Sequence, residues 1–163
     1  MGSLTLFGFP ANEKLAGGKA SDKKFTPVSF HEPVFERIRE KLRTNFVKQS
    51  KSSYSSSDGK IGLVISISKQ HPPFNSQFDS RYWFAFHPHQ ETFLGPFDEA
   101  YACYGCGNER KVFMVPFPFL KDRLDLIWKT KGTEREYTHI VIYQKDDKYY
   151  LRTNTDERRN GRV

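Results

Sequence analysis

Residues 81–86, with the sequence RYWFAF, decide the fold class of this chain. The even-numbered positions of this stretch all hold rings, whereas the odd-numbered positions hold Arg, Trp and Ala. Successive side chains of a β-strand point to opposite faces of a sheet, so the alternation predicts a strand with one buried face. We expect the even-numbered rings to face the core, and we expect Arg81 and Trp83 to face outward.

Further strands are predicted on both sides of this stretch. Each is a run that alternates in polarity or is rich in β-branched and aromatic residues, bounded by Gly, Pro, Asn or Asp. These runs cover residues 61–68, 99–104, 111–115, 137–144 and 148–152. Only Lys145-Asp146-Asp147 separates the last two, which predicts a closing hairpin.

Two amphipathic helices are predicted, over residues 31–48 and 117–130, because apolar residues recur there at steps of three and four. The segments 70–80 and 87–98 are predicted to be connections, and the Ser-rich segment 49–60 is predicted to be a mobile loop. This order predicts an α+β fold. We expect a mixed, strongly twisted or barrel-like sheet of about six strands, with two main helices packed on one face.

The chain of 163 residues is long enough for one domain with its own core. We expect an irregular N-terminal arm over residues 1–30, a single α+β domain over 31–155 and a basic tail over 156–163. No stretch approaches the ~18 apolar residues of a membrane span, and residues 1–30 lack the apolar run of a secretory signal. We therefore expect a cytoplasmic location, no membrane partner, and two reduced cysteines.

The charge of the chain favours a polyanion as its partner. Lys and Arg number 26 against 19 Asp and Glu, a formal net charge of +7. Rings on a sheet surface can stack on bases while cations neutralise phosphates. The candidate residues are rings or cations on strands or at strand ends: Arg81, Trp83, Tyr104, Lys111, Lys145, Lys148 and Arg152. They predict a domain that recognises nucleic acid, in the first place double-stranded DNA, without a cofactor and with Trp83 contacting a base.

A metal-dependent nuclease is the first alternative. A helix followed by three strands, a helix and another strand is the core order of the PD-(D/E)XK nucleases, and Asp98, Glu109 and Lys111 match the residue types of their motif. Two carboxylates would hold Mg²⁺, and the lysine would steady the charge at the attacked phosphate. Glu109 departs from that pattern because it falls in a turn before the strand.

A zinc-stabilised module for protein interaction is the second alternative. Cys103 and Cys106 have the spacing of a zinc knuckle, and His87 and His89 lie in a predicted turn, so the four could offer two nitrogen and two sulfur ligands to Zn²⁺. The same cysteines could instead supply a thiol nucleophile with His139 as its base. A buried cysteine and a turn cysteine would explain the spacing equally well.

The segments YWFAFHPHQETFL, VFMVPFPFL, YTHIVI and YYLRT, with a Cys-Gly turn among them, span roughly residues 81–153. Together they resemble a module associated with bacterial restriction and defence proteins. The resemblance implies that the chain accompanies a nuclease or another effector, as part of a larger parent protein. It assigns no active residues.

Overall fold

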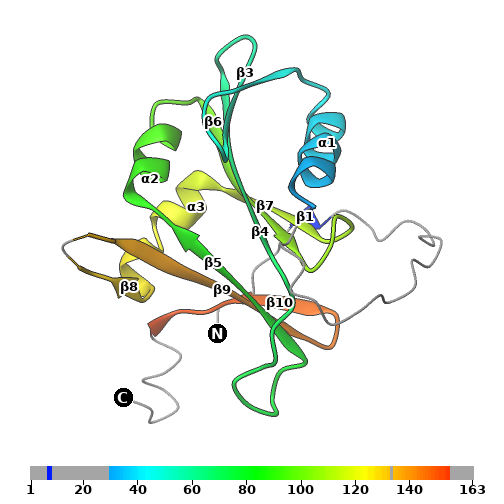
Figure 1. Ribbon diagram of the computed structural model, residues 1–163, viewed down its shortest axis with the longest axis vertical. Helices are drawn as coiled ribbons and strands as arrows, with labels where there is room; N and C mark the ends of the chain where they lie inside the picture. Colours follow the sequence, from blue (N-terminus) through cyan, green and yellow to red (C-terminus); the bar gives the residue numbers. More distant parts are fainter. Residues whose placement is uncertain (1–6, 9–29, 133, 155–163) are drawn as a thin grey trace.

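The computed structural model describes residues 7–8, 30–132 and 134–154, and it has an α+β fold built on two sheets (Figure 1). The first sheet has six strands in the order β1-β7-β6-β4-β3-β2. Their bounds are β1 Phe7–Gly8, β2 Phe46–Lys48, β3 Ser53–Ser56, β4 Ile61–Ser68, β6 Glu99–Cys106 and β7 Val112–Pro116. The sheet is mixed, because β4 and β6 are parallel neighbours and the other pairs are antiparallel.

The second sheet has four strands and is formed by the chain that leaves the first sheet after β4 and again after β7. Its strands are β5 Ser80–Phe86, β8 Lys129–Thr130, β9 Tyr137–Lys145 and β10 Lys148–Leu151. β9 is central: it pairs with β5 along one edge and with β10 and β8 along the other, always antiparallel. The predicted hairpin at the end of the domain is therefore confirmed.

The helices lie on both faces of the six-stranded sheet (Figure 1). Helix α1 (His31–Leu42) covers one face, while α2 (Pro88–Leu94), α3 (Phe117–Lys121) and a 3-10 turn (Leu124–Leu126) lie on the other, beside the four-stranded sheet. In the described residues no helix is long and apolar enough to cross a membrane.

Two apolar clusters hold these layers together. The larger one lies between the sheets, where Tyr82, Phe84 and Phe86 meet residues of β4, β6 and β7 and the short helices close its side. The smaller one lies beneath α1, where Val34 and Ile38 are fully buried. Both faces of β4, β6 and β7 are thus covered, so consecutive residues of these strands are buried instead of every second one.

Several details of the predicted fold are wrong. The sheet is not one barrel-like sheet of six strands but two open sheets, and the helices are not confined to one face. The helix predicted over residues 31–48 ends at Leu42, because Arg43 takes a left-handed conformation (φ 50°). Phe46 continued the helical stripe, yet it reaches Phe35 from strand β2.

Two predicted connections also contain regular structure, and one predicted helix is divided. The Ser-rich segment 49–60 contains β3, in which Ser53, Tyr54 and Ser56 are buried. Segment 87–98 contains α2, and the helix predicted over 117–130 divides into α3, the 3-10 turn and β8. The predicted N-terminal arm contributes the short strand β1, whereas the predicted basic tail, residues 156–163, lies outside the described residues.

Candidate functional site

The side of the four-stranded sheet that faces away from the six-stranded sheet carries the candidate site, and we call it the outer face. Strand register defines it: Arg81 lies opposite Tyr143, and Trp83 lies opposite Val141. The alternate residues of β5 face the core, as the sequence predicts. By the same register the outer face holds residues 81, 83 and 85 of β5, the odd-numbered residues 137–145 of β9, and residues 148 and 150 of β10.

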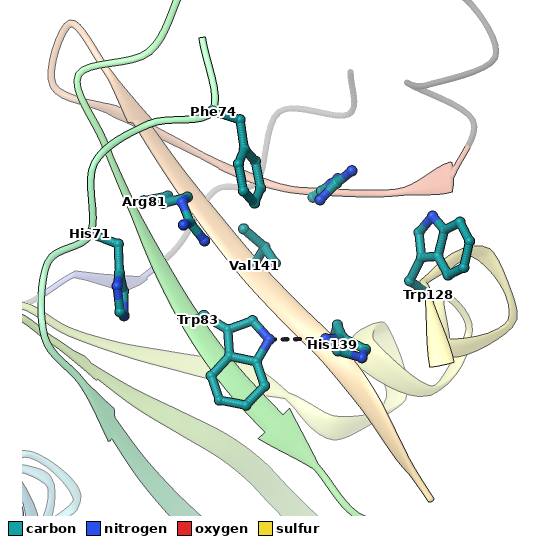
Figure 2. A pocket seen from close by; sticks show the side chains of 8 residues that line it. His71, Phe74, Arg81, Trp83, Trp128, His139 and Val141 are labelled. Carbon is teal, nitrogen blue, oxygen red and sulfur yellow. Dashed lines mark hydrogen bonds between the residues drawn. The ribbon is translucent and has the colours of Figure 1, made fainter. Parts of the chain in front are cut away.

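A pocket of about 520 Å³ opens on the outer face (Figure 2). Four of its residues belong to β5 and β9, and the others come from the segment before β5, the residue before β8 and the residue after β10. They are His71, Phe74, Arg81, Trp83, Trp128, His139, Val141 and Arg152. Val141 is buried and forms the base of the pocket, since it lies on the central strand.

A hydrogen bond fixes the indole of Trp83. Its Nε1 donates to Nδ1 of His139 over 3.0 Å (Figure 2), and Nε2 of His139 lies 2.6 Å from Oγ1 of Thr130. An indole N–H can only donate, so Nδ1 of His139 must carry a lone pair. Burial, and then the charge of Arg152, hold the pKa of His139 below its usual value and keep this imidazole neutral. The polar atom of the indole is therefore used, while part of the ring surface stays exposed beside the rings of Tyr137 and His139.

The guanidinium of Arg81 is held in a defined position at the other side of the pocket. Its Nε donates to the carbonyl of Pro72 over 2.7 Å, and its Cζ lies 3.9 Å from the centre of the Phe74 ring. Backbone hydrogen bonds between His71 and Arg81 tie this connection to β5. Burial, followed by the charge of Arg81, lowers the pKa of His71, so both imidazoles of the pocket are next to an arginine.

Exposed aromatic surface and positive charge coincide in this pocket. Phe74, Trp83 and Trp128 keep 54%, 37% and 57% of their surface exposed, although they are large apolar residues. Arg81 and Arg152 supply two positive charges, and none of the eight lining residues is acidic. The pocket can therefore bind a flat ring through its faces and an anionic group through guanidinium groups.

The predicted cations Lys145 and Lys148 lie on the outer face beyond the pocket. They are opposite each other at the end of the β9-β10 hairpin, and both are exposed. The two residues of the turn between them are Asp146 and Asp147, both with positive φ. Two acidic residues therefore lie between the two lysines in the sequence. With Arg81 and Arg152, these lysines place four of the predicted cations on one face.

Two residues predicted to bind nucleic acid do not lie on this face. Tyr104 is fully buried between the sheets, where its ring contacts Phe84 at 4.6 Å between centroids. Lys111 points inward, and its Nζ donates to Oη of Tyr82 over 3.2 Å and to Oε1 of Gln144 over 3.1 Å. The prediction failed for both because residues of the second sheet contact these two side chains, which the local sequence around the turn does not show.

The structure does not bring the predicted nuclease residues together. Asp98 precedes β6 and Glu109 follows it, and eight residues of strand separate the two on the order of 20 Å. The backbone carbonyl of Glu109 also accepts a hydrogen bond from Arg37 of α1, on the far side of the six-stranded sheet from the pocket. Carboxylates so far apart cannot share one Mg²⁺ ion, and Lys111 is engaged by Tyr82 and Gln144.

The predicted zinc ligands are not brought together either. Cys103 belongs to the cluster beneath α1, whereas Cys106 belongs to the cluster between the sheets, so their thiols point to opposite faces of β6. Both are buried, and burial raises the pKa of each thiol, which disfavours the thiolate that zinc binding or nucleophilic attack needs. His87 and His89 instead stack on each other at the start of α2. Among the described residues no three His, Cys, Asp or Glu side chains form a group that could hold a metal ion.

Sequence reasoning did not predict several residues of the pocket. His139 and Val141 lie at alternate positions of β9. Once the pairing of β9 with β5 is known, this alternation places both side chains on the outer face. Trp128 looked like the last residue of a helical stripe, but it follows a 3-10 turn, and its carbonyl accepts the N–H of His139. For Phe74 the sequence holds no signal, because it lies in a Pro-rich connection.

No protein-family model matches the chain, and neither a curated protein nor a solved structure is significantly similar to it. The functional assignment therefore depends on the geometry of the outer face and on the charge of the chain.

Proposed function

We propose that the chain is a nucleic-acid-binding domain that uses the outer face of the four-stranded sheet, with double-stranded DNA as its first candidate partner. One observation carries the proposal: Arg81, Lys145, Lys148 and Arg152 share this face with Trp83 and Trp128, whose rings are exposed around a pocket. A net charge of +7 supports the same class of partner.

The roles of these residues follow from their chemistry. Lysines at the exposed hairpin interact with phosphates as point charges and release counterions from the nucleic acid, which makes affinity depend on salt. Arginines near the rings combine hydrogen bonds to phosphate with stacking. Tryptophan faces stack on any base, so the face supplies affinity in all sequence contexts and leaves sequence preference to smaller effects. Membership of a restriction or defence protein stays a prediction.

Binding to a labelled duplex and to a labelled single strand, measured by fluorescence anisotropy over a series of salt concentrations, tests the proposal. The affinity is expected to fall linearly on a double logarithmic plot. The double variant K145Q/K148Q is expected to lower the magnitude of that slope by about 2, because each lysine that contacts a phosphate contributes about 1.

The matched control is K51Q/K60Q, which removes the same charge from exposed lysines at the other sheet. It is expected to leave the slope close to that of the parent. Equal effects of the two double variants would show that net charge, and not the outer face, governs binding. Binding that does not change with salt would contradict an interface led by phosphate contacts.

A further inference from the structure

Both tryptophans of the 163-residue chain line the same pocket. Trp83 comes from β5, and Trp128 comes from the segment between the 3-10 turn and β8, 45 positions later in the sequence. Figure 2 shows them on opposite sides of His139. Each is pinned through that residue: the indole of Trp83 donates to Nδ1 of His139, and the carbonyl of Trp128 accepts the His139 N–H over 2.8 Å.

This arrangement prepares ring faces for a ligand. Most large apolar residues in the part of the chain that the structure describes are buried, and Phe74, Trp83 and Trp128 are three of the five exposed there. Exposed aromatic rings gathered in a hollow are typical of sites for a ligand with apolar surface. Because the N–H of Trp83 is already bonded, this residue can offer a ligand only its faces, and a flat ring makes the best use of them.

The charges of the pocket narrow the chemical class of the ligand further. Arg81 and Arg152 line the same hollow, and none of its eight lining residues among the described parts of the chain is acidic, so a ligand with a negative group beside its ring fits it. A cavity of about 520 Å³ falls within the range of sites for one small molecule. A paired and stacked base offers no free face, so a nucleotide can enter such a pocket only when it is unstacked.

We propose that the pocket holds one unstacked nucleotide, with its base against the rings of Trp83 and Trp128 and its phosphate at Arg81 and Arg152. The source of the nucleotide, a strand and not a free nucleotide, rests on the function proposed above. The remaining cations of the outer face, Lys145 and Lys148, contact the phosphates of neighbouring nucleotides and play no part in holding the base.

Tryptophan fluorescence of the full chain is a direct reporter, since no tryptophan lies outside the pocket. Deoxynucleoside 5′-monophosphates are expected to quench it saturably, with dissociation constants below about 1 mM. The corresponding nucleosides and 2-deoxyribose 5-phosphate are expected to bind at least about tenfold more weakly, because each lacks one half of the ligand. Purines are expected to bind more tightly than pyrimidines, since their larger rings stack better.

Matched variants separate the two halves of the pocket. W128A is expected to weaken the binding of monophosphates by about 5- to 100-fold, with Trp83 as the remaining fluorescent reporter. L126A removes another exposed apolar residue nearby and is expected to leave this affinity unchanged. R81Q is expected to weaken the binding of the monophosphates but not that of the nucleosides. K145Q is expected to weaken the binding of long duplexes and to leave the affinity for mononucleotides unchanged.

A second arm uses duplexes that differ in one base pair. A duplex with a central mismatch is expected to bind more tightly than the fully paired duplex, because its base costs less to extrude. Equal binding of the two duplexes, together with no quenching by millimolar nucleotides, overturns the pocket but leaves duplex binding intact if K145Q/K148Q still weakens it. Quenching by nucleotides without binding of any strand supports the pocket and overturns the proposed function.

Discussion

Trp83 and Phe84 are neighbours in sequence with opposite fates. Phe84 is 2% exposed and packs against Tyr104 between the sheets, whereas Trp83 is 37% exposed on the outer face. The alternation of β5 places one ring in the core and the other at the pocket. Two neighbouring residues of one strand are therefore expected to have different roles, one mainly in stability and the other mainly in binding. The two roles can be tested independently.

The substitutions W83A and F84A are expected to have contrasting effects. F84A should lower the free energy of unfolding by about 3–5 kcal/mol, through lost transfer energy and a cavity between the sheets. W83A should lower it by about 1 kcal/mol, because the indole gives up one hydrogen bond with His139. W83A should instead weaken nucleic-acid binding by about 1–3 kcal/mol per base contacted.

Thermal melting and anisotropy titrations with the same protein samples measure both quantities. If W83A unfolds the chain, its ring supports the core through Tyr137 and His139 more than its exposure indicates. If W83A folds and binds as the parent does, the bases contact another part of the surface.

At the scale of elements, local periodicity predicted the strands well and the ends of the helices poorly. β4, β5 and β9 carry their alternation or apolar character within the strand, so their sequence alone identifies them. The end of α1 depends instead on the left-handed Arg43, a residue with no strong preference for that conformation. The division of the chain into two sheets was not predictable either, because alternation shows which face is buried but not which strands pair.

Strand β3 shows how pairing can overrule composition. Its sequence SYSS is typical of a loop, yet it lies between β2 and β4, and Tyr54 stacks on Phe35 of α1 at 4.4 Å between centroids. The hydroxyl of Ser56 donates to Asp58 over 2.6 Å and accepts the N–H of Ile61 over 2.8 Å, which satisfies a buried polar group at the hairpin. Serine is thus compatible with a strand whose polar atoms find partners.

We expect the amides of residues 53–56 to exchange with solvent much more slowly than those of residues 74–77. The first group lies in a strand with a neighbour on each side, whereas the second lies in bends and turns on the connection before β5. Native-state hydrogen exchange followed by mass spectrometry of short peptides measures both in one experiment. Equal exchange in the two segments would mean that the β2-β3 edge of the sheet opens readily in solution.

At the scale of the whole molecule, the core and the candidate site lie on different faces of the sheets. The two apolar clusters lie between the sheets and beneath α1, which leaves the outer face of the four-stranded sheet to present the candidate site. The sequence predicted five of the seven proposed binding residues on that face, because parity along β5, β9 and β10 follows from the sequence once the register is known. Tyr104 and Lys111 were misplaced because their positions depend on how the second sheet covers the first, which no local pattern records.

The stability of the whole molecule is expected to fall as the pH drops below about 6.5, the ordinary pKa of histidine. Burial lowers the pKa of His31, His71 and His139 in the folded chain. Between 6.5 and those lower values the unfolded chain binds more protons than the folded one, so stability decreases with falling pH and levels off once the folded histidines are also protonated. Protonated His139 would in addition point an N–H at the N–H of Trp83 and break their hydrogen bond.

The melting temperature is therefore expected to be lower at about pH 5 than at about pH 7.5, with a change in tryptophan fluorescence over the same range. H139Q should reduce this dependence on pH, whereas H89Q, at an exposed position, should preserve it. A parent protein with the same melting temperature at both pH values would show that these histidines are as free to take up protons in the folded chain as in the unfolded one.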